Sequence, residues 1–574
     1  MNRIRQAIGY VVEVSGTEVT LNLSEEHKGQ IAGHYYGMST IGEIGDLIGI
    51  DCGFRLYVIK VLELEFSEPK DLHNEKDQSF KNPLRQIRGL VIGWLENNVF
   101  IANSLSSPSL GSKAYPITNK ELNIILGTQN KDAHLLLGRE YRSGQKIQTD
   151  LNKLLTQHVA VLGSSGQGKS CFTASVLQQL AKLPRSKIVI FDINGEYSQA
   201  LSQSGDLIKE TIIGKQTPSS PPNIEHYKIP YFALGRTGLN RLFMPSEKTQ
   251  RPALSFAISQ LPFVEWDDEK QGVKVGGSTE LFDDCRSGPA DKAWGKVQEL
   301  RKHKIQALPH WPSMKVLPAL IAESQCITPS YKGGSYERNS FSYGNIAPLI
   351  TRIHRLIEDD CFTSIIDIHG GQKIQNSNPF DVAQNELVNK IFGEANQTAW
   401  HTHIVNLTQV PQDLMPLVLG SLLECYTHVL FTRGVENKEP TLLILEEAHH
   451  YLRKVNEQEE SSYSLAYERL AKEGRKFGLS LWLSTQRPSE ISPTVLAQCN
   501  TWVCFRLTSE KDLSVVSYGC EWANKREVYK IAGLPRQHAI ILGKAVPFPV
   551  YVKVPTANPL PNSHDGDFNS WADK

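Results

Sequence analysis

The stretch Gly163-Ser-Ser-Gly-Gln-Gly-Lys-Ser170 decides how this chain folds. It follows the apolar run His158-Val-Ala-Val-Leu162 and precedes a stretch with helical character, Cys171 to Lys182. This is the pattern G-x-x-x-x-G-K-[ST], in the strand, loop and helix setting that a phosphate-binding loop requires. It predicts an α/β domain that binds a nucleoside triphosphate, although a glycine-containing loop can match the pattern by chance.

The residue types explain the spacing of this motif. Glycines let backbone N–H groups curl around a polyphosphate at the positive end of the following helix. Lys169 is predicted to reach the β and γ phosphates, and the Ser170 hydroxyl is predicted to ligate Mg²⁺. The predicted cofactors are therefore ATP and Mg²⁺. The predicted nucleotide-binding residues are Gly163, Ser164, Ser165, Gly166, Gln167, Gly168, Lys169 and Ser170.

The length and composition of the chain limit the number of domains, the kind of nucleic-acid surface and the cellular compartment that we expect. A chain of 574 residues is too long for one hydrophobic core, so we expect several domains. Lys plus Arg and Asp plus Glu each total 61, so any surface that binds nucleic acid must be local. The nine cysteines form no C-x-x-C pair, which favours buried thiols in a reducing compartment. With no signal peptide and no apparent membrane span, we expect a cytoplasmic protein without a membrane partner.

The first segment is predicted to be a small β-barrel. Ile8 to Val14 and Thr17 to Leu23 alternate around a Ser15-Gly16 turn, as the two strands of a hairpin do. Two more pairs of short strands follow, Leu47 to Ile50 with Phe54 to Leu64, and Leu90 to Leu95 with Val99 to Ala102. Nothing in this segment has the character of a catalytic site.

Beyond the barrel, apolar runs typical of a parallel sheet occur in two groups. The runs are Val159 to Leu162, Lys187 to Asp192, His403 to Leu407, Thr441 to Leu445, Leu479 to Ser484 and Thr501 to Phe505. About two hundred residues separate the second run from the third, with helical stretches at Ala290 to Ala307 and Asn345 to Glu358. We interpret them as a largely helical insertion into one α/β domain.

Two adjacent carboxylates, Glu446 and Glu447, follow the apolar strand Leu442 to Leu445. The carboxyl end of such a strand is where the γ-phosphate and Mg²⁺ of a bound nucleotide lie. Glu446 is predicted to hold the metal through water, and Glu447 to polarise the attacking water. A strand that ends in a charged helix cap is the alternative. Glu446 stands where Asp is more usual, so slower hydrolysis is a possibility.

Two further positions are predicted to act on the γ-phosphate. Gln486 closes the next strand and is placed to sense the phosphate or orient water, unless it is only part of the turn before Pro488. The basic helix upstream offers Arg475 as an arginine finger for a neighbouring subunit, with Arg506 as second choice. A solvated basic helix face is the alternative for Arg475.

Five motifs occur in an order and context that resemble HerA, of the HerA/FtsK group of hexameric DNA translocases. They are Gly163 to Ser170, Phe191-Asp-Ile-Asn-Gly-Glu-Tyr197, Leu445-Glu-Glu-Ala-His449, Glu473-Gly-Arg-Lys-Phe-Gly478 and Ser484-Thr-Gln-Arg-Pro488. The resemblance implies a RecA-like P-loop ATPase core and a homohexameric ring with double-stranded DNA in its channel. It also implies Asp192 and Glu447 as catalytic carboxylates and Arg475 acting in trans.

The resemblance sets the expected domain boundaries. Residues 1–130 form an N-terminal β-barrel similar to the HAS barrel, and residues 131–200 and 401–554 form the two parts of the ATPase core. Residues 201–400 form the helical insertion, and residues 555–574 form an extended arm or disordered tail.

The leading functional prediction is an ATP-driven double-stranded DNA translocase or helicase that works with a partner enzyme. The chain has no nuclease carboxylate cluster of its own, so cutting is assigned to a partner of the NurA type, or the effector is of the sirtuin type in antiphage defence. The alternative is a nucleotide-bound ring that scaffolds an effector, with hydrolysis secondary. A type IV secretion coupling ATPase is disfavoured because no membrane helix is predicted.

Overall fold

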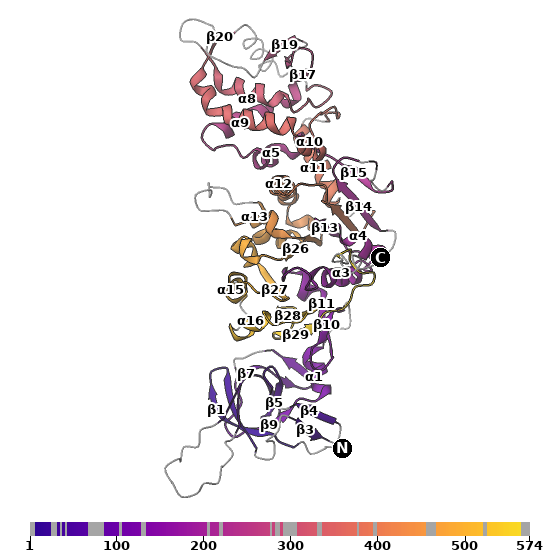
Figure 1. Ribbon diagram of the computed structural model, residues 1–574, viewed down its shortest axis with the longest axis vertical. Coiled ribbons are helices and arrows are strands. Elements are labelled where there is room, and N and C mark those ends of the chain that lie inside the picture. The colour runs from indigo at the N-terminus through magenta and orange to yellow at the C-terminus, as the bar shows by residue number, and fades with distance from the viewer. Residues whose placement is uncertain are drawn as a thin grey trace, which may run out of the picture. The chain divides into compact units, whose positions relative to one another are not determined.

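The computed structural model describes most of the chain as two compact units (Figure 1). The first comprises Met1–Leu154, Glu521–Asn524 and His538–Pro555, and the second comprises Leu155–Cys520, Lys525–Gln537 and Thr556–Lys574. The described residues are 6–24, 31–34, 37–40, 43–66, 85–102, 106–127, 134–203, 207–216, 218, 222–275, 278–281, 288–290, 307–329, 336–375, 378–393, 399–454, 466–520 and 525–563.

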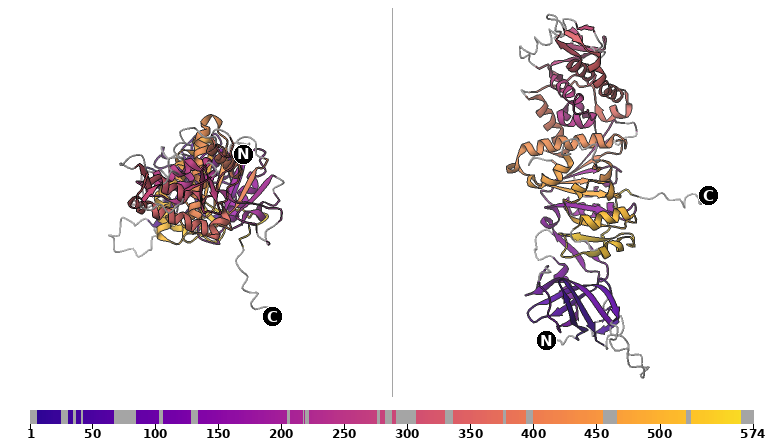
Figure 2. Two further views of the ribbon diagram at one scale, coloured as in Figure 1. Left: turned by 90° about the horizontal axis from the view of Figure 1, so that it is seen from above. Right: turned by 90° about the vertical axis from the view of Figure 1, so that its left-hand side faces the viewer.

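A closed antiparallel β-barrel forms the centre of the first unit (Figure 2, indigo strands). Its strands follow the order β2-β1-β9-β5-β6-β7, and β2 also pairs with β7, which closes the sheet and removes its edges. Alternate side chains such as Val19, Ile50 and Ile59 point inward and are fully buried. The strands are β1 (Gly9–Ser15), β2 (Glu18–Leu23), β5 (Leu47–Asp51), β6 (Leu56–Phe66), β7 (Arg85–Glu96) and β9 (Lys113–Pro116), with β8 (Val99–Ile101) added to β7. The predicted barrel and its three hairpins are confirmed.

Four further strands in this unit come from two segments that lie far apart in the sequence and pair with each other. β10 (His134–Glu140) pairs with β11 (Lys146–Asp150) and β29 (Val550–Lys553), and β29 pairs with β28 (His538–Gly543). These strands belong to the same compact unit as the barrel. The predicted boundaries, which assign them to the ATPase core, stay a prediction. The local sequence carries no signal for pairing between such distant segments. The other elements of the unit are β3 (Ile31–His34), β4 (Gly37–Thr40), α1 (Asn119–Leu126) and α2 (Leu151–Leu155).

The second unit is built on a parallel sheet in which six strands are largely apolar and buried, while β14 and β15 also carry charged residues. The order is β27-β12-β26-β25-β13-β24-β14-β15, and the pairs recorded between neighbours are parallel. The strands are β12 (His158–Leu162), β13 (Ile188–Asp192), β14 (Ile208–Ile213), β15 (Glu225–Tyr227), β24 (Thr402–Asn406), β25 (Thr441–Leu445), β26 (Leu479–Thr485) and β27 (Cys499–Cys504). All six predicted strands are present. β14 and β15 were not predicted, so the sheet extends into the segment interpreted as insertion.

Helices cover the sheet and connect its strands (Figure 1). They are α3 (Lys169–Leu180), α4 (Tyr197–Leu201), α12 (Met415–Arg433), η4 (Val435–Asn437), η5 (Ala448–His450), α13 (Ala466–Glu473), η6 (Gly474–Phe477), η7 (Pro488–Glu490), α14 (Pro493–Leu496), α15 (Glu510–Gly519) and α16 (Lys525–Ile531).

A mainly helical segment lies between β15 and β24 in the sequence. Its helices are η2 (Tyr231–Leu234), α5 (Gly235–Phe243), α6 (Gln250–Gln260), η3 (Leu261–Phe263), α8 (Val316–Cys326), α9 (Ser340–Glu358), α10 (Asp360–Ile365) and α11 (Pro379–Phe392). Its short strands are β16 (Ile229–Pro230), β17 (Glu265–Asp267), β18 (Gly272–Val275), β19 (Ser278–Leu281), β20 (Gly288–Ala290), β21 (Ile327–Pro329), β22 (Tyr336–Arg338) and β23 (Ile366–Asp367). The predicted helix at Asn345 to Glu358 lies within α9, while most of Ala290 to Ala307 lies outside the described residues. The predicted fold class is confirmed.

Helix α12 corrects one expectation from the sequence. By length and composition it could cross a membrane, whereas the sequence was expected to contain no such run. In the structure 67% of its apolar window is buried, and it packs against α5, α11 and α13. Its apolar character therefore fits a core helix that is surrounded by other helices.

Candidate nucleotide site

The predicted phosphate loop connects the carboxyl end of β12 to the amino end of α3. Gly168 is the N-cap residue of α3 with φ 114°, a conformation that a side chain at this position would strain. Gly163 is required for a different reason, since a Cβ there would lie 2.5 Å from the Cβ of Phe505. No side chain caps the first turn of α3, so its N–H groups are available to an anion.

Two chain segments that the sequence analysis did not connect with the site support this loop. The Ser164 N–H donates to the Arg506 carbonyl at 2.9 Å, and the Gln537 N–H donates to the Gln167 carbonyl at 2.9 Å. Gln537 has φ 62°, the left-handed conformation, which is uncommon outside glycine. These contacts fix the loop from the side of β27 and from the segment that follows α16.

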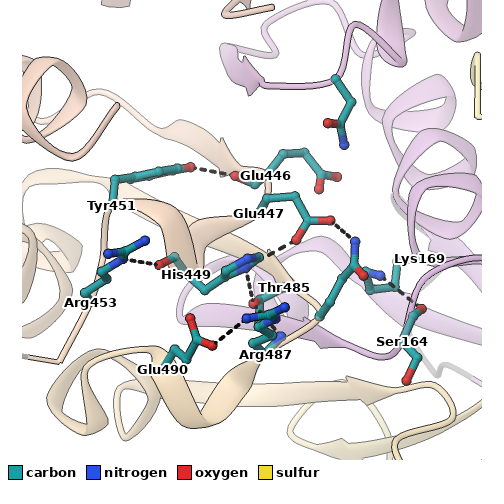
Figure 3. Close-up of polar contacts among 12 residues, drawn as sticks. Ser164, Lys169, Glu446, Glu447, His449, Tyr451, Arg453, Thr485, Arg487 and Glu490 are labelled. Carbon is teal, nitrogen blue, oxygen red and sulfur yellow. Dashed lines mark hydrogen bonds and ion pairs between the residues drawn. The ribbon is translucent and has the colours of Figure 1, made fainter. Parts of the chain in front are cut away.

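Lys169 lies at the start of α3 and is 6% exposed. Its Nζ donates to the Ser164 carbonyl at 3.2 Å across the loop (Figure 3). Burial lowers the pKa of Lys169, and the nearby carboxylates of Glu447, Glu446 and Glu196 oppose that shift. Those carboxylates keep a positive charge at the place where the β and γ phosphates of a nucleotide would lie.

Glu446 follows β25 and is held at both ends by buried tyrosines. The Tyr197 hydroxyl donates to its Oε1. The Tyr451 hydroxyl donates to its main-chain carbonyl at 3.0 Å (Figure 3). Burial raises the pKa of Glu446 to about 7, while the hydrogen bond from Tyr197 acts to lower it. A donor to a carboxylate stabilises the ionised form, so Tyr197 both orients the group and favours its charge.

Glu447 is held by the next strand of the sheet. Gln486, at the end of β26, donates through Nε2 to Oε1 of Glu447, so the structure brings these two predicted residues together. The other oxygen, Oε2, is buried without a hydrogen-bond partner and lies 3.3 Å from Nδ1 of His449 (Figure 3). That ring nitrogen is 3.0 Å from the Thr485 hydroxyl. Glu447 itself has φ 41°, and such backbone strain is common at functional sites.

The carboxylate of Asp192 accepts hydrogen bonds from main-chain N–H groups. Its oxygens accept the N–H groups of Gly195 at 2.8 Å, Glu196 at 3.1 Å and Tyr197 at 3.0 Å. Burial raises the pKa of Asp192 to about 6, and these hydrogen bonds oppose the shift. Asp192 therefore shapes the turn that carries Tyr197 toward Glu446. A direct catalytic role for Asp192 stays a prediction.

The two candidate arginines lie at opposite ends of the parallel strands. We call the side of the sheet where its strands end the carboxyl edge, and the side where they begin the amino edge. Arg506 follows β27 at the carboxyl edge, where its carbonyl contacts the phosphate loop. Arg475 lies in η6, directly before β26 begins at Leu479, and is therefore at the amino edge. A strand of five residues separates these edges by about 15 Å. Arg475 is exposed, and within the described part of the chain no carboxylate pairs with it.

The residues present fit a magnesium nucleotide. Mg²⁺ at phosphate sites keeps several waters and takes one or two protein ligands besides the phosphates. Ser170 and Glu446 supply oxygens of that kind, and Oε2 of the adjacent Glu447 is a buried acceptor with no hydrogen-bond donor. Among the described residues no cluster of three or more His, Cys, Asp or Glu could hold a metal by itself. The nucleotide would therefore supply the remaining ligands.

Sequence reasoning missed Tyr197 and His449 as site residues. Tyr197 lies inside the quoted motif Phe191 to Tyr197, and His449 lies inside Leu445 to His449, so both positions were in view. A tyrosine after a strand gave no chemical signal, because its role depends on a carboxylate more than two hundred residues away. Phe505 and Gln537, which support the phosphate loop, had no local signal.

Comparison with known proteins places this site in a wider group. Residues 135–283 match the family described as the central domain of helicase HerA. The DNA double-strand break repair helicase HerA of Pyrococcus furiosus is 23% identical over 487 residues, covering 81% of this chain and 76% of that protein. The probable DNA double-strand break repair helicase HerA of Methanocaldococcus jannaschii is 26% identical over 471 residues, covering 81% and 84%. The solved structure of VirB4 of Thermoanaerobacter pseudethanolicus aligns with a TM-score of 0.43 at 13% identity, over 75% of this chain and 98% of that one.

Replacing Lys169 by Ala removes the buried cation of the phosphate loop. We expect binding of a fluorescent ATP analogue to weaken by orders of magnitude, because a phosphate-loop lysine contacts the β and γ phosphates directly. The matched control is Lys182→Ala, an exposed lysine just beyond the other end of α3, which should bind as the unchanged protein does. Equal binding by the two variants would contradict the site.

Replacing Tyr197 by Phe removes the hydroxyl that holds Glu446 and should raise the Mg²⁺ concentration needed for nucleotide binding. A hydrogen bond to a charged group contributes about 1.5–3 kcal/mol, so we expect a shift on the order of tenfold at pH 7. The loss also raises the pKa of Glu446 further above about 7, so the defect should shrink as the pH increases toward 9. Tyr451→Phe is the control, since it loses a bond to the main chain only. Identical Mg²⁺ titrations for both variants would refute the role of Tyr197.

Proposed function

This chain is a HerA-type P-loop ATPase, and on that basis we propose that it is an ATP-driven double-stranded DNA translocase or helicase that works as a homohexamer. One observation carries the proposal. A complete set of phosphate-binding and carboxylate residues lies at the carboxyl edge of the sheet, while the exposed Arg475 lies at the amino edge. An arginine in that place is too far from its own phosphate loop and suits a neighbour's nucleotide.

The residues of one subunit divide the work of hydrolysis. Lys169 and the N–H groups of the phosphate loop bind the β and γ phosphates. Ser170 and Glu446 would hold Mg²⁺, which would neutralise charge on the phosphates. Glu447 accepts a proton from the attacking water, and Gln486 fixes the orientation of Glu447 through its amide. Arg475 of the adjacent subunit stabilises the charge that develops on the γ-phosphate.

The names of the relatives support the proposed substrate. HerA proteins are described as DNA double-strand break repair helicases, which supports DNA as the polymer that this chain moves. The zero net charge of the chain means that its DNA contacts are local. We propose a separate nuclease or effector as partner, of the NurA or sirtuin type, a role in antiphage defence, and a cytoplasmic location. The free cysteines of the described residues are compatible with a reducing compartment.

A nucleotide-bound ring that scaffolds an effector is the second candidate. The observation in its favour is Glu446, because burial raises its pKa to about 7 and so disfavours the charged form that would hold Mg²⁺. Such a site would bind nucleotide well and turn it over slowly. The two candidates differ in whether DNA accelerates ATP turnover.

The test of the proposal is ATP turnover with and without double-stranded DNA. A translocase should turn over ATP several times faster when DNA is present. Glu447→Gln should keep nucleotide and DNA bound while hydrolysis falls by two or more orders of magnitude, because the amide cannot accept the proton. Glu490→Gln, a half-exposed carboxylate paired with Arg487, is the control and should stay active. If DNA does not change the rate of ATP turnover while the chain still activates its effector, the nucleotide-bound scaffold is favoured.

Arginine action in trans is tested by mixing two inactive variants. Arg475→Ala should bind nucleotide but lose on the order of 10³-fold in turnover. In a mixed ring, an Arg475→Ala subunit supplies an intact phosphate loop and a Lys169→Ala subunit supplies an intact arginine, so some interfaces are complete. We expect measurable activity from the mixture and almost none from either variant. A fully active monomer that does not need Arg475 would contradict both the ring and the trans role.

A further inference from the structure

A buried histidine joins the strand of the phosphate loop to the helix that precedes Arg475. His158, the first residue of β12, is 2% exposed. Its Nε2 lies 2.8 Å from the Ala471 carbonyl, and its Nδ1 accepts the Leu481 N–H at 3.0 Å. A carbonyl can only accept, so the ring must carry its proton on Nε2 and be neutral. Burial lowers the pKa of His158 to about 4, in agreement with a neutral ring.

The elements that meet at His158 are those that carry the site. β12 leads into the phosphate loop, and β26, which contains Leu481, ends next to Gln486. Ala471 belongs to the last turn of α13, which continues directly into η6 with Arg475. The positive charge of Arg475 is close enough to lower the pKa of His158. His158 therefore contacts the strand of the subunit's own nucleotide and the helix that presents its arginine.

We infer that His158 is a positioning residue that fixes the place of Arg475 relative to the phosphate loop of the same subunit. This inference rests on the proposed function, in which Arg475 completes the site of a neighbour. Each subunit would then present an arginine whose position is set by the strand that holds its own nucleotide. A misplacement of a catalytic group by 1 Å costs on the order of 100-fold in rate, so one buried hydrogen bond can matter.

Two substitutions separate the two hydrogen bonds of the ring. In His158→Asn the short side chain keeps an acceptor near the Leu481 N–H but is too short to donate to the Ala471 carbonyl. In His158→Gln the amide lies one bond further out and can donate to that carbonyl. We expect nucleotide binding to be unchanged in both, with turnover reduced 10- to 100-fold in the Asn variant and largely rescued in the Gln variant.

His403→Asn is the matched control. His403 is also buried at the amino end of a core strand, where Nδ1 lies 2.7 Å from the Ile391 carbonyl and Nε2 lies 2.9 Å from the Thr211 hydroxyl. Its pKa is likewise lowered to about 4 by burial. Since its partners are remote from α13, this variant loses similar hydrogen bonds without touching the helix of Arg475. We expect a comparable loss of thermal stability and a much smaller loss of turnover.

Mixed assemblies decide whether the defect belongs to the arginine or to the phosphate loop. If His158 positions Arg475, activity of the Asn variant should be restored by Lys169→Ala subunits, which contribute an intact arginine. Mixing with Arg475→Ala subunits should not restore it. The reverse pattern, restoration by both or restoration by neither would overturn the inference. If the Asn variant does not fold, the weaker defect of the Gln variant is measured in the same mixtures.

A reference mixture separates failure of this inference from failure of the proposed function. Arg475→Ala with Lys169→Ala must regain activity by itself. If it does not, the trans arginine is refuted, and the inference falls with it. If it does, and the His158 mixtures give another pattern than the one expected, only the role of His158 is refuted.

Discussion

The site depends on keeping opposite charges together where the buried, largely apolar strands β12 and β25 end. Lys169, Glu446 and Glu447 are each at most 6% exposed, and an isolated ion in such surroundings is strongly disfavoured. Each carboxylate opposes the fall in the pKa of Lys169 that burial causes. The lysine and carboxylates are therefore acceptable in this place because they are near one another. A bound magnesium nucleotide would add both signs of charge to the same group.

Main-chain geometry holds this cluster in place through a short series of contacts. Asp192 accepts the N–H groups that form the turn after β13, the turn places Tyr197, and Tyr197 holds Glu446. Gln486 holds Glu447 from the opposite side. The carboxylates are thus oriented from both neighbouring strands, β13 and β26, so that binding needs little rearrangement of the protein.

Because the strands are parallel, all of them end on one side of the sheet, and different functional residues lie on its two sides. The carboxyl edge carries the phosphate loop, Glu447 and Gln486, and the amino edge carries His158 and the segment with Arg475. The strands between these two edges are buried and largely apolar. A subunit with this architecture has a nucleotide-binding edge and an arginine-presenting edge, which suits head-to-tail contacts in a ring.

The barrel, the six core strands, the phosphate loop and the pair Glu446 and Glu447 could be predicted from the amino-acid sequence. Each of those features has a local sequence pattern: alternating apolar and polar residues, a run of apolar residues, or a motif with fixed spacing. The tertiary structure alone decided that β14 and β15 extend the sheet, that Tyr197 holds Glu446, and that His158 contacts the helix before Arg475. It also showed that the carboxylate of Asp192 accepts hydrogen bonds from main-chain N–H groups. Arg475 lies at the amino edge of the sheet, away from its own phosphate loop. The turn at Asp192 is local. The other features depend on contacts between residues distant in the chain, and such contacts leave no periodicity or spacing for a single sequence to display.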